Sequence, residues 1–272
     1  MISDITYQKS NYQGLYIEHK YESKVHILNH PFAKTMLAKL CQPKTVLPEV
    51  NHITSKLYEI LMMEVFNHSF CQKSYEIQTR MSEFSDKGAF KSDLLDQSEK
   101  LVFVNLARAG TWPSHVCFEM SNALLNPENL RQDHIYINRK TNDKGEVIGE
   151  NFYGSKIGGG QEDAYVIFPD PMGATGGSLS RCVSHYKDTV QGKAKKYIAL
   201  HLIITPEYIQ RLKQDHPDIE IYALRLDRGN SSQEVLDSIP GTYPEKESGL
   251  TEIQYIIPGA GGMGEVLNNS YV

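Results

Sequence analysis

The sequence has few cysteines, and no two of them lie close together. The four are Cys41, Cys71, Cys117 and Cys182 among 272 residues, so there is no C-x-x-C pair and no zinc-finger spacing. A secreted disulfide scaffold carries more cysteines in a shorter chain, which makes free thiols in a reducing compartment the simpler interpretation. The ten histidines form no ligand cluster, and no protein metal site is expected.

The sequence also lacks long apolar segments and an excess of positive charge. No stretch reaches the roughly 18 apolar residues that span a bilayer, and residues 1–5 do not resemble the start of a signal peptide. The 28 basic and 33 acidic side chains give a net charge of −5, whereas nucleic-acid binding usually shows as clustered positive charge. We therefore expect a soluble, cytoplasmic protein that binds neither a membrane nor a nucleic acid.

What the sequence does contain is an alternation of short apolar runs and amphipathic segments. The apolar runs are 101–106, 134–137, 165–168, 197–204 and 219–226. Helical periodicity marks 31–41, 52–66, 114–125, 178–186 and 206–214. This alternation predicts an α/β fold in which a mostly parallel five-stranded sheet is flanked by helices. In such sheets ligands bind at the carboxyl ends of the strands.

Three segments do not fit the alternation. Residues 1–24 are polar and rich in tyrosine, and we interpret them as an N-terminal extension. Residues 142–161 and 228–249 are rich in glycine, serine or charge, and are predicted to be long mobile loops.

The segment 164–178, Ala-Tyr-Val-Ile-Phe-Pro-Asp-Pro-Met-Gly-Ala-Thr-Gly-Gly-Ser, carries the strongest chemical signal. A buried strand runs into Asp170, and a loop of small residues leads into a helix. Glycines let backbone N–H groups turn inward, and a helix N-terminus adds donors and partial positive charge. A turn that merely requires glycine is the alternative, but the acid and the hydroxyls of Thr175 and Ser178 favour phosphate binding. No Gly-Lys-Ser/Thr follows, so this is not a Walker A loop.

This segment resembles the 5-phosphoribosyl 1-pyrophosphate (PRPP) loop of the type I phosphoribosyltransferases, in the form found in uracil phosphoribosyltransferases. Other family motifs follow in the family's order. They are Val-His-x-Leu-x-His-Pro at 25–31, Arg-Ala-Gly at 108–110, His-Ile-x-x-x-Arg at 134–139, Phe-Tyr-x-x-Lys at 152–156, Pro-Glu at 206–207, His-Pro-Asp-Ile at 216–219 and Tyr-Ile-Ile-Pro-Gly-Ala-Gly at 255–261. The resemblance therefore covers 25–272 as one phosphoribosyltransferase domain, with 1–24 as its extension.

The resemblance implies a type I phosphoribosyltransferase fold with a hood and a flexible flap, assembled as a homodimer or higher homo-oligomer. It implies transfer of the phosphoribosyl group of PRPP to uracil, which gives UMP and pyrophosphate in pyrimidine salvage. Mg²⁺ is expected as a cofactor bound mainly through PRPP. The glycine-rich segment 154–160 is expected to close over the substrate and exclude water.

The resemblance also implies site residues. Asp170, Arg108 and Arg139 are the expected catalytic residues, with the two arginines on pyrophosphate and Asp170 on the ribose hydroxyls. The expected PRPP-binding residues are Arg108, Ala109, Arg139, Asp170, Met172, Gly173, Ala174, Thr175, Gly176, Gly177 and Ser178. The expected uracil-binding residues are Tyr255, Ile256, Gly261, Gly262 and Met263.

The chain departs from the family pattern in its base loop. The family's Gly-Asp-Ala-Gly-Asp is here Gly261-Gly262-Met263-Gly264-Glu265, and a leucine of the PRPP loop is Gly173. These changes leave two alternatives open: a phosphoribosyltransferase for another base, and a PRPP-binding regulator without turnover. The G-x-G-x-x-G at 259–264 also matches a dinucleotide fingerprint, but the helix, second strand and acid that this motif needs do not follow it.

Overall fold

The computed structural model describes residues 16–141 and 147–270, with the backbone alone at 139–141, 147–148 and 150. The helices are α1 (Pro31–Leu40), α2 (Glu49–Ser69), α3 (Thr111–Asn122), α4 (Gly177–Thr189), α5 (Pro206–Asp215), α6 (Gln233–Leu236) and α7 (Met263–Asn268). The strands are β1 (Val25–Ile27), β2 (Gln72–Gln78), β3 (Ala89–Leu95), β4 (Lys100–Ala107), β5 (Leu130–Thr141), β6 (Val147–Lys156), β7 (Ala164–Pro169), β8 (Met172–Gly173), β9 (Lys196–Ile204) and β10 (Glu220–Leu226). All five predicted strands and all five predicted helices are among these elements.

The main sheet has the strand order β1-β10-β9-β7-β4-β5-β6, and β8 pairs with β9. All of its pairings are parallel except that of β5 with β6. The five predicted strands, β4, β5, β7, β9 and β10, form its centre. The sheet is wider than predicted because short β1 and β8 and the edge strand β6 add to it.

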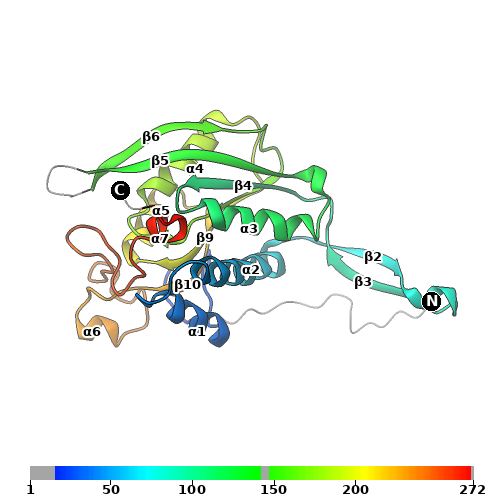
Figure 1. Ribbon diagram of the computed structural model, residues 1–272, viewed down its shortest axis with the longest axis horizontal. Coiled ribbons are helices and arrows are strands. Elements are labelled where there is room, and N and C mark those ends of the chain that lie inside the picture. Colours follow the sequence, from blue (N-terminus) through cyan, green and yellow to red (C-terminus); the bar gives the residue numbers. More distant parts are fainter. Residues whose placement is uncertain (1–15, 142–146, 271–272) are drawn as a thin grey trace.

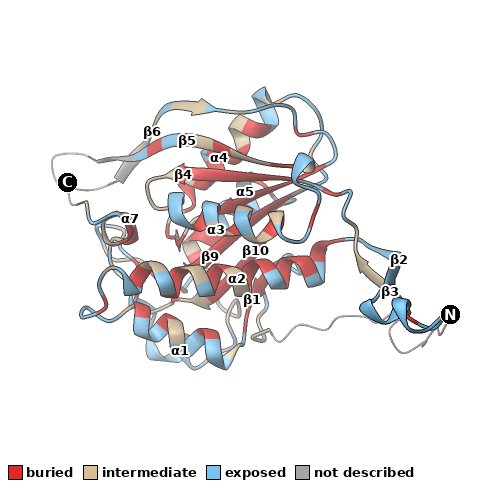
Figure 2. Cartoon of the chain, turned by 45° about the vertical axis from the view of Figure 1, so that its right-hand side comes forward, coloured by how far each residue is buried: buried red, intermediate tan, exposed pale blue. Residues whose placement is uncertain are grey.

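The sheet lies between two helical layers, as Figures 1 and 2 show. All six residues of β7 are buried, and successive side chains point to opposite faces. Tyr165 and Ile167 belong to the core under α1, α2, α3 and α7. Val166 and Phe168 belong to the core under α4 and α5. A continuous apolar run is therefore what a strand covered on both sides requires.

The prediction of a mobile loop at 142–161 is wrong for most of that segment. Residues 147–156 form β6, antiparallel to β5, while 142–146 lie outside the described residues. The expected flap at 154–160 is wrong as well. Arg131 donates to the carbonyls of Gly159 (3.1 Å) and Gly160 (2.6 Å), and the Gly158 N–H donates to Asp133. These bonds tie the glycines to the amino end of β5, the edge of the sheet that ligands do not use.

The segment 228–249 is irregular, as predicted, apart from the short helix α6. It is organised around a buried ion pair in which Arg228 Nη1 lies 2.8 Å from Glu247 Oε1. Arg228 also donates to the carbonyls of Val235 and Ser238, and the Gly241 N–H donates to Glu247. The segment is thus packed around its own buried charges.

The antiparallel hairpin β2–β3 was not predicted from the sequence. It projects from the body of the molecule beyond the end of α2 (Figures 1 and 2), with β2 exposed and β3 mostly half-buried. No helix within the described part of the chain has the length and apolarity needed to cross a membrane.

Candidate active site

A cavity of about 560 Å³ lies at the carboxyl ends of β4, β5 and β7. Its walls come from the ends of these strands, the loop that leads into α4, and the C-terminal segment around α7. The lining residues that the sequence analysis predicted are Arg108, Ala109, Asp170, Met172, Gly173, Ala174, Thr175, Gly176, Ser178, Tyr255, Ile256, Gly261, Gly262 and Met263. Residues as far apart in the sequence as Arg108 and Glu265, 157 positions, therefore meet at one site.

Among the predicted residues that the structure describes in full, only Gly177 does not line this cavity. Gly177 is buried in the first turn of α4. Arg139 pairs through its backbone with Glu150 of β6, and its side chain lies outside the described residues. Its expected contact with pyrophosphate stays a prediction. Ile137 and Asn138, earlier in the same strand β5, line the cavity.

The loop 170–178 has the form of an anion site. Gly176 adopts a left-handed conformation (φ 79°), which glycine tolerates without strain, and no side chain caps α4 there. The first N–H groups of an uncapped helix are donors with partial positive charge. Thr175 and Ser178 add hydroxyls to the same lining. This arrangement suits a phosphate group.

Gly173 is required by the packing of its neighbours. A Cβ at this position would lie 2.9 Å from Ile204 Cγ2 and 3.0 Å from Tyr208 Cδ2. The ring of Tyr208 therefore fills the space that a side chain at Gly173 would need. Sequence analysis did not identify Tyr208, although it lines the cavity.

Asp170 follows β7 directly and is held through its backbone. Its N–H donates to the Leu200 carbonyl (3.0 Å), and its carbonyl accepts from His201 Nδ1 (2.6 Å). The other ring nitrogen of His201 lies 2.6 Å from the Tyr208 hydroxyl. Burial lowers the pKa of His201 to about 4, so the ring is neutral.

Arg108 lies just beyond β4 and is tied to the C-terminal segment. Its Nη1 donates to the carbonyl (3.1 Å) and hydroxyl (2.9 Å) of Ser270, and its Nη2 is 3.5 Å from Glu265 Oε1. The guanidinium is about a third exposed. It can therefore exchange these partners for a bound anion.

Glu265 folds back onto Gly262 at the start of α7. A Cβ at Gly262 would collide with the Glu265 carboxylate. The Glu265 carboxylate thus occupies the space that a side chain at Gly262 would need. Met263 does line the cavity, but it is 2 % exposed and belongs to the same buried cluster as Leu267.

The base segment is held by a buried ion pair that sequence analysis missed. Asp227 Oδ2 accepts from the Gly259 N–H (2.8 Å), and Arg225 Nη2 donates to the Gly259 carbonyl (3.0 Å). Arg225 Nε and Asp227 Oδ1 are 2.6 Å apart. Since Asp227 directly follows the predicted strand 219–226, the rule that ligands bind at carboxyl ends could have identified it.

The acids of the cavity fit a magnesium ion that arrives with its substrate. Asp170 and Glu265 are the carboxylates among its lining residues, and the described residues contain no cluster of three metal-ligating side chains. Mg²⁺ is usually held by one or two carboxylates together with substrate phosphates, so a protein cage is not needed.

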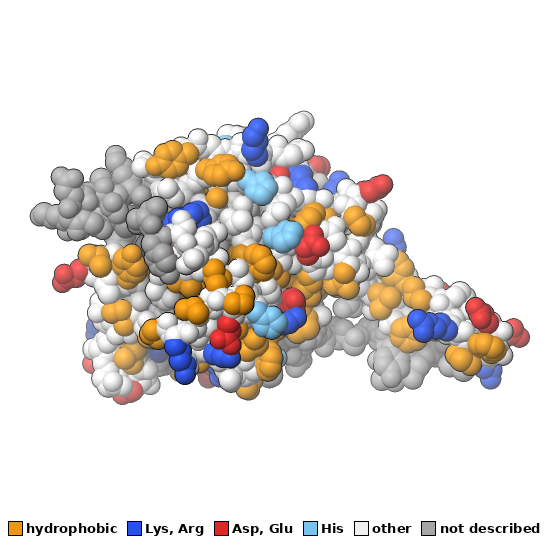
Figure 3. Space-filling view, viewed as in Figure 1, with side chains coloured by type: hydrophobic (Ala, Val, Ile, Leu, Met, Phe, Trp, Pro, Cys, Tyr) orange, Lys and Arg blue, Asp and Glu red, His pale blue; other side chains and the backbone are white. Residues whose placement is uncertain are grey.

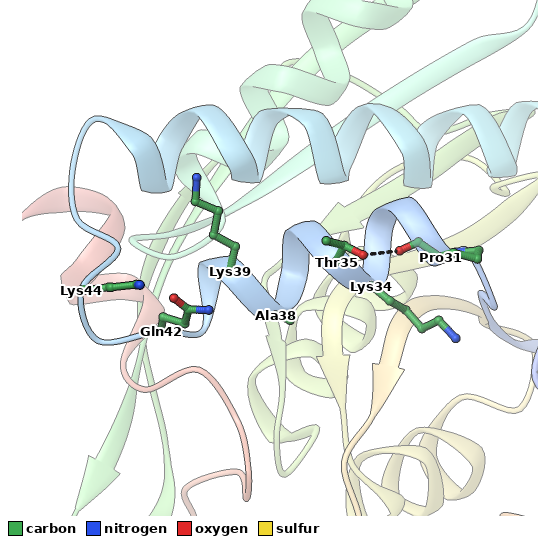
Figure 4. Close-up of a pocket in the computed structure, with 7 residues that line it drawn as sticks. All are labelled: Pro31, Lys34, Thr35, Ala38, Lys39, Gln42 and Lys44. Carbon is green, nitrogen blue, oxygen red and sulfur yellow. Dashed lines mark hydrogen bonds between the residues drawn. The ribbon is translucent and has the colours of Figure 1, made fainter.

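A second concavity, of about 750 Å³, lies along α1 (Figure 4). Its lysines are Lys34, Lys39 and Lys44. Lys34 donates to Asn29, and Lys39 pairs with Glu49. Because it is formed by one helix and the loop after it, it lacks the convergent polar groups of a binding site.

Comparison with known proteins gives a consistent result. The family model described as uracil phosphoribosyltransferase matches residues 27–242. The chain is 27% identical to the uracil phosphoribosyltransferase of Shouchella clausii, over 90% of this chain and 97% of that protein. It is 28% identical to that of Dictyoglomus turgidum, over 89% and 97%. The solved structure of the AQ2163 protein from Aquifex aeolicus has a TM-score of 0.67 at 22% identity, covering 91% of this chain and 99% of that one.

Proposed function

The chain belongs to the uracil phosphoribosyltransferase family, and we propose that the cavity at the carboxyl ends of β4, β5 and β7 is its active site. The enzyme transfers the phosphoribosyl group of PRPP to uracil, which gives UMP and pyrophosphate. The observation that carries the assignment of the site is the meeting of the phosphate loop, Arg108 and the base segment around one cavity.

The reaction exchanges one bond at the anomeric carbon of ribose for another. The bond to the pyrophosphate oxygen breaks, a bond to a uracil nitrogen forms, and the proton of that nitrogen passes to the released pyrophosphate. Positive charge builds on the ribose and negative charge on the leaving pyrophosphate. Fixed donors around the leaving group lower this barrier because they are oriented before the charge develops.

Arg108 and the backbone of Ala109 take the pyrophosphate in this proposal, joined by Arg139. A guanidinium presents several N–H donors that suit phosphate oxygens, and pyrophosphate would displace Ser270 and Glu265 from Arg108. Asp170 accepts hydrogen bonds from the ribose hydroxyls. The 5′-phosphate lies against the loop 174–178 and the N-terminus of α4.

The base lies between Tyr255, Ile256 and the turn Gly261–Met263. Uracil is small and planar, so backbone N–H and C=O groups can read its polar edge without long side chains. Gly261 has φ 72°, which turns the backbone at this point in a way that favours glycine. The hydrogen bonds of Asp227 and Arg225 to Gly259 fix where this turn begins.

Bound with PRPP, Mg²⁺ would supply Lewis-acid stabilisation of the pyrophosphate charge. The proposal places the enzyme in the cytoplasm, because a substrate with this much charge does not cross a bilayer. We also propose that the enzyme assembles as a homodimer. The projecting hairpin β2–β3 exposes Ile77, Met81, Phe84 and Phe90, and Figure 3 shows apolar side chains among charged ones on it. An exposed apolar patch of this kind marks a protein–protein contact.

The test combines calorimetric titration of PRPP with Mg²⁺ and a panel of bases. We expect nucleotide formation with uracil, and we expect Asp170→Asn and Arg108→Ala to weaken PRPP binding at least tenfold. Asp188→Asn, on the exposed end of α4, is the matched control and should bind PRPP normally. Unchanged PRPP binding in Asp170→Asn and Arg108→Ala would show that the site is elsewhere. Turnover with a different base alone would refute the uracil assignment and keep the site.

A further inference from the structure

The PRPP loop is fastened to α5 at two points. At the first point, Thr205, the N-cap of α5, donates to the Ala174 carbonyl (2.6 Å), and its N–H donates to the Gly173 carbonyl (3.1 Å). The second point is a buried chain of hydrogen bonds that runs from Tyr208 through His201 to Asp170. Neither Tyr208 nor His201 has a role in the chemistry described above.

The donor and the acceptor of each hydrogen bond in the chain can be assigned by starting from the Asp170 carbonyl. The Asp170 carbonyl can only accept, so His201 Nδ1 carries the proton. The ring is fully buried and neutral, which leaves Nε2 as an acceptor for the Tyr208 hydroxyl. Tyr208 therefore selects the tautomer of His201 that donates to Asp170. The ring of Tyr208 also packs over Gly173, which lies three residues after Asp170 in the same loop.

We propose that His201 and Tyr208 are positioning residues that hold Asp170 toward the ribose of PRPP. His201 lies on β9 and Tyr208 on α5, and both are buried. His201 is not among the lining residues of the cavity, and Tyr208 lines it beside Gly173. Both residues act on Asp170 through its backbone carbonyl. This inference rests on the proposed placement of PRPP in the cavity.

The proposal predicts different effects on the KM values of the two substrates. Weaker hydrogen bonding of Asp170 misplaces the carboxylate that faces ribose. The base segment is held by Asp227 and stays in place. We expect Tyr208→Phe, which keeps the ring over Gly173 and removes the hydroxyl, to raise the KM for PRPP roughly tenfold with little change in the KM for uracil.

The matched control is Tyr186→Phe. Tyr186 is equally buried on the same face of the sheet, and its hydroxyl donates to the buried Asp133 (2.7 Å), far from the cavity. It should lose comparable stability and keep both KM values. His201→Asn and His201→Leu form a second pair, because the asparagine amide can still donate to the Asp170 carbonyl and leucine cannot. We expect His201→Asn to retain most of the PRPP affinity that His201→Leu loses.

Direct titration of PRPP, with Mg²⁺ and no base, measures the effect without turnover. If the wild type binds PRPP and makes no UMP, the uracil assignment fails, and the titrations still decide the role of His201. Equal PRPP affinity in Tyr208→Phe and the wild type would overturn the proposal. So would equal losses in His201→Asn and His201→Leu, or a parallel rise of both KM values in Tyr208→Phe.

Discussion

The ion pair of Arg225 and Asp227 should set how well the enzyme holds its base. Asp227 is 2 % exposed and accepts from the Gly259 N–H, while Arg225 donates to the carbonyl of the same residue. Both polar groups of Gly259 are thus fixed by one pair. Gly259 comes only two residues before the turn that begins at Gly261, so a shift at Gly259 moves the proposed base contacts.

The loss of stability in Asp227→Ala can be worked out from Arg225, which is left without its ion-pair partner. Breaking a fully buried ion pair by removing one partner costs about 3–5 kcal/mol. Arg225 is 28% exposed and can recover part of its solvation, which places the loss at the lower end, about 3 kcal/mol. Asp227→Asn keeps one acceptor oxygen for Gly259 but loses the charge and the hydrogen bond from Arg225 Nε, and we expect a loss of about 1–2 kcal/mol.

Urea unfolding measures the stability of both variants, and steady-state kinetics measures their function. We expect the KM for uracil to rise at least tenfold in Asp227→Ala, with the KM for PRPP near that of the wild type. Glu220→Gln is the control: its pair with Lys196 (2.6 Å) lies at the other end of the same strand, β10. It should lower stability without changing either KM. An unchanged KM for uracil in Asp227→Ala would refute the positioning role.

Three further predictions concern packing and protonation. Gly173→Leu should lower stability by about 1–3 kcal/mol, since its side chain must displace Tyr208 or Ile204, and a thermal-melting comparison with Gly158→Leu checks this. Gly262→Asp should reduce activity, because its Cβ collides with the Glu265 carboxylate, and Glu265→Ala in the same chain should restore part of it. Burial lowers the pKa values of His26 and His201 from 6.5 to about 4, so the unfolded chain binds more protons between these values. The unfolding free energy should therefore fall as the pH drops from 6.5 to 4, by up to about 3 kcal/mol for each histidine. Urea titrations at a series of pH values measure this fall, and His201→Asn should remove the part of it that comes from His201.

The centre of the fold could be predicted because its strands are buried on both faces. The run of β7 and the acid directly after it are visible in the sequence as five apolar residues and Asp170. The hairpin β2–β3 could not be found in this way. Its two strands pair through their backbones, β2 almost wholly exposed and β3 mostly half-buried, which leaves no apolar pattern to detect.

The candidate site was predicted where single segments carry a motif and missed where distant segments meet. The loop 170–178 is continuous in the sequence, so its chemistry could be inferred from its residues. Tyr208 reaches Asp170 only through His201, and Asp227 contacts Gly259 although the two residues lie 32 positions apart in the sequence. Contacts of this kind depend on the tertiary fold, and a reading of local spacing does not contain them.

The two glycines that depart from the family pattern obey one physical rule. At Gly173 the missing side chain is replaced by the ring of Tyr208, and at Gly262 by the carboxylate of Glu265. The space at Gly173 is filled by a residue of the distant helix α5, and the space at Gly262 by a residue of the same turn, so an acid stays near Gly262. Restoring the family residue alone should then damage the site, because two side chains would compete for one volume. A double-mutant cycle at each position tests this, and the expected sign of the coupling is favourable: the paired change should be less harmful than the sum of its parts.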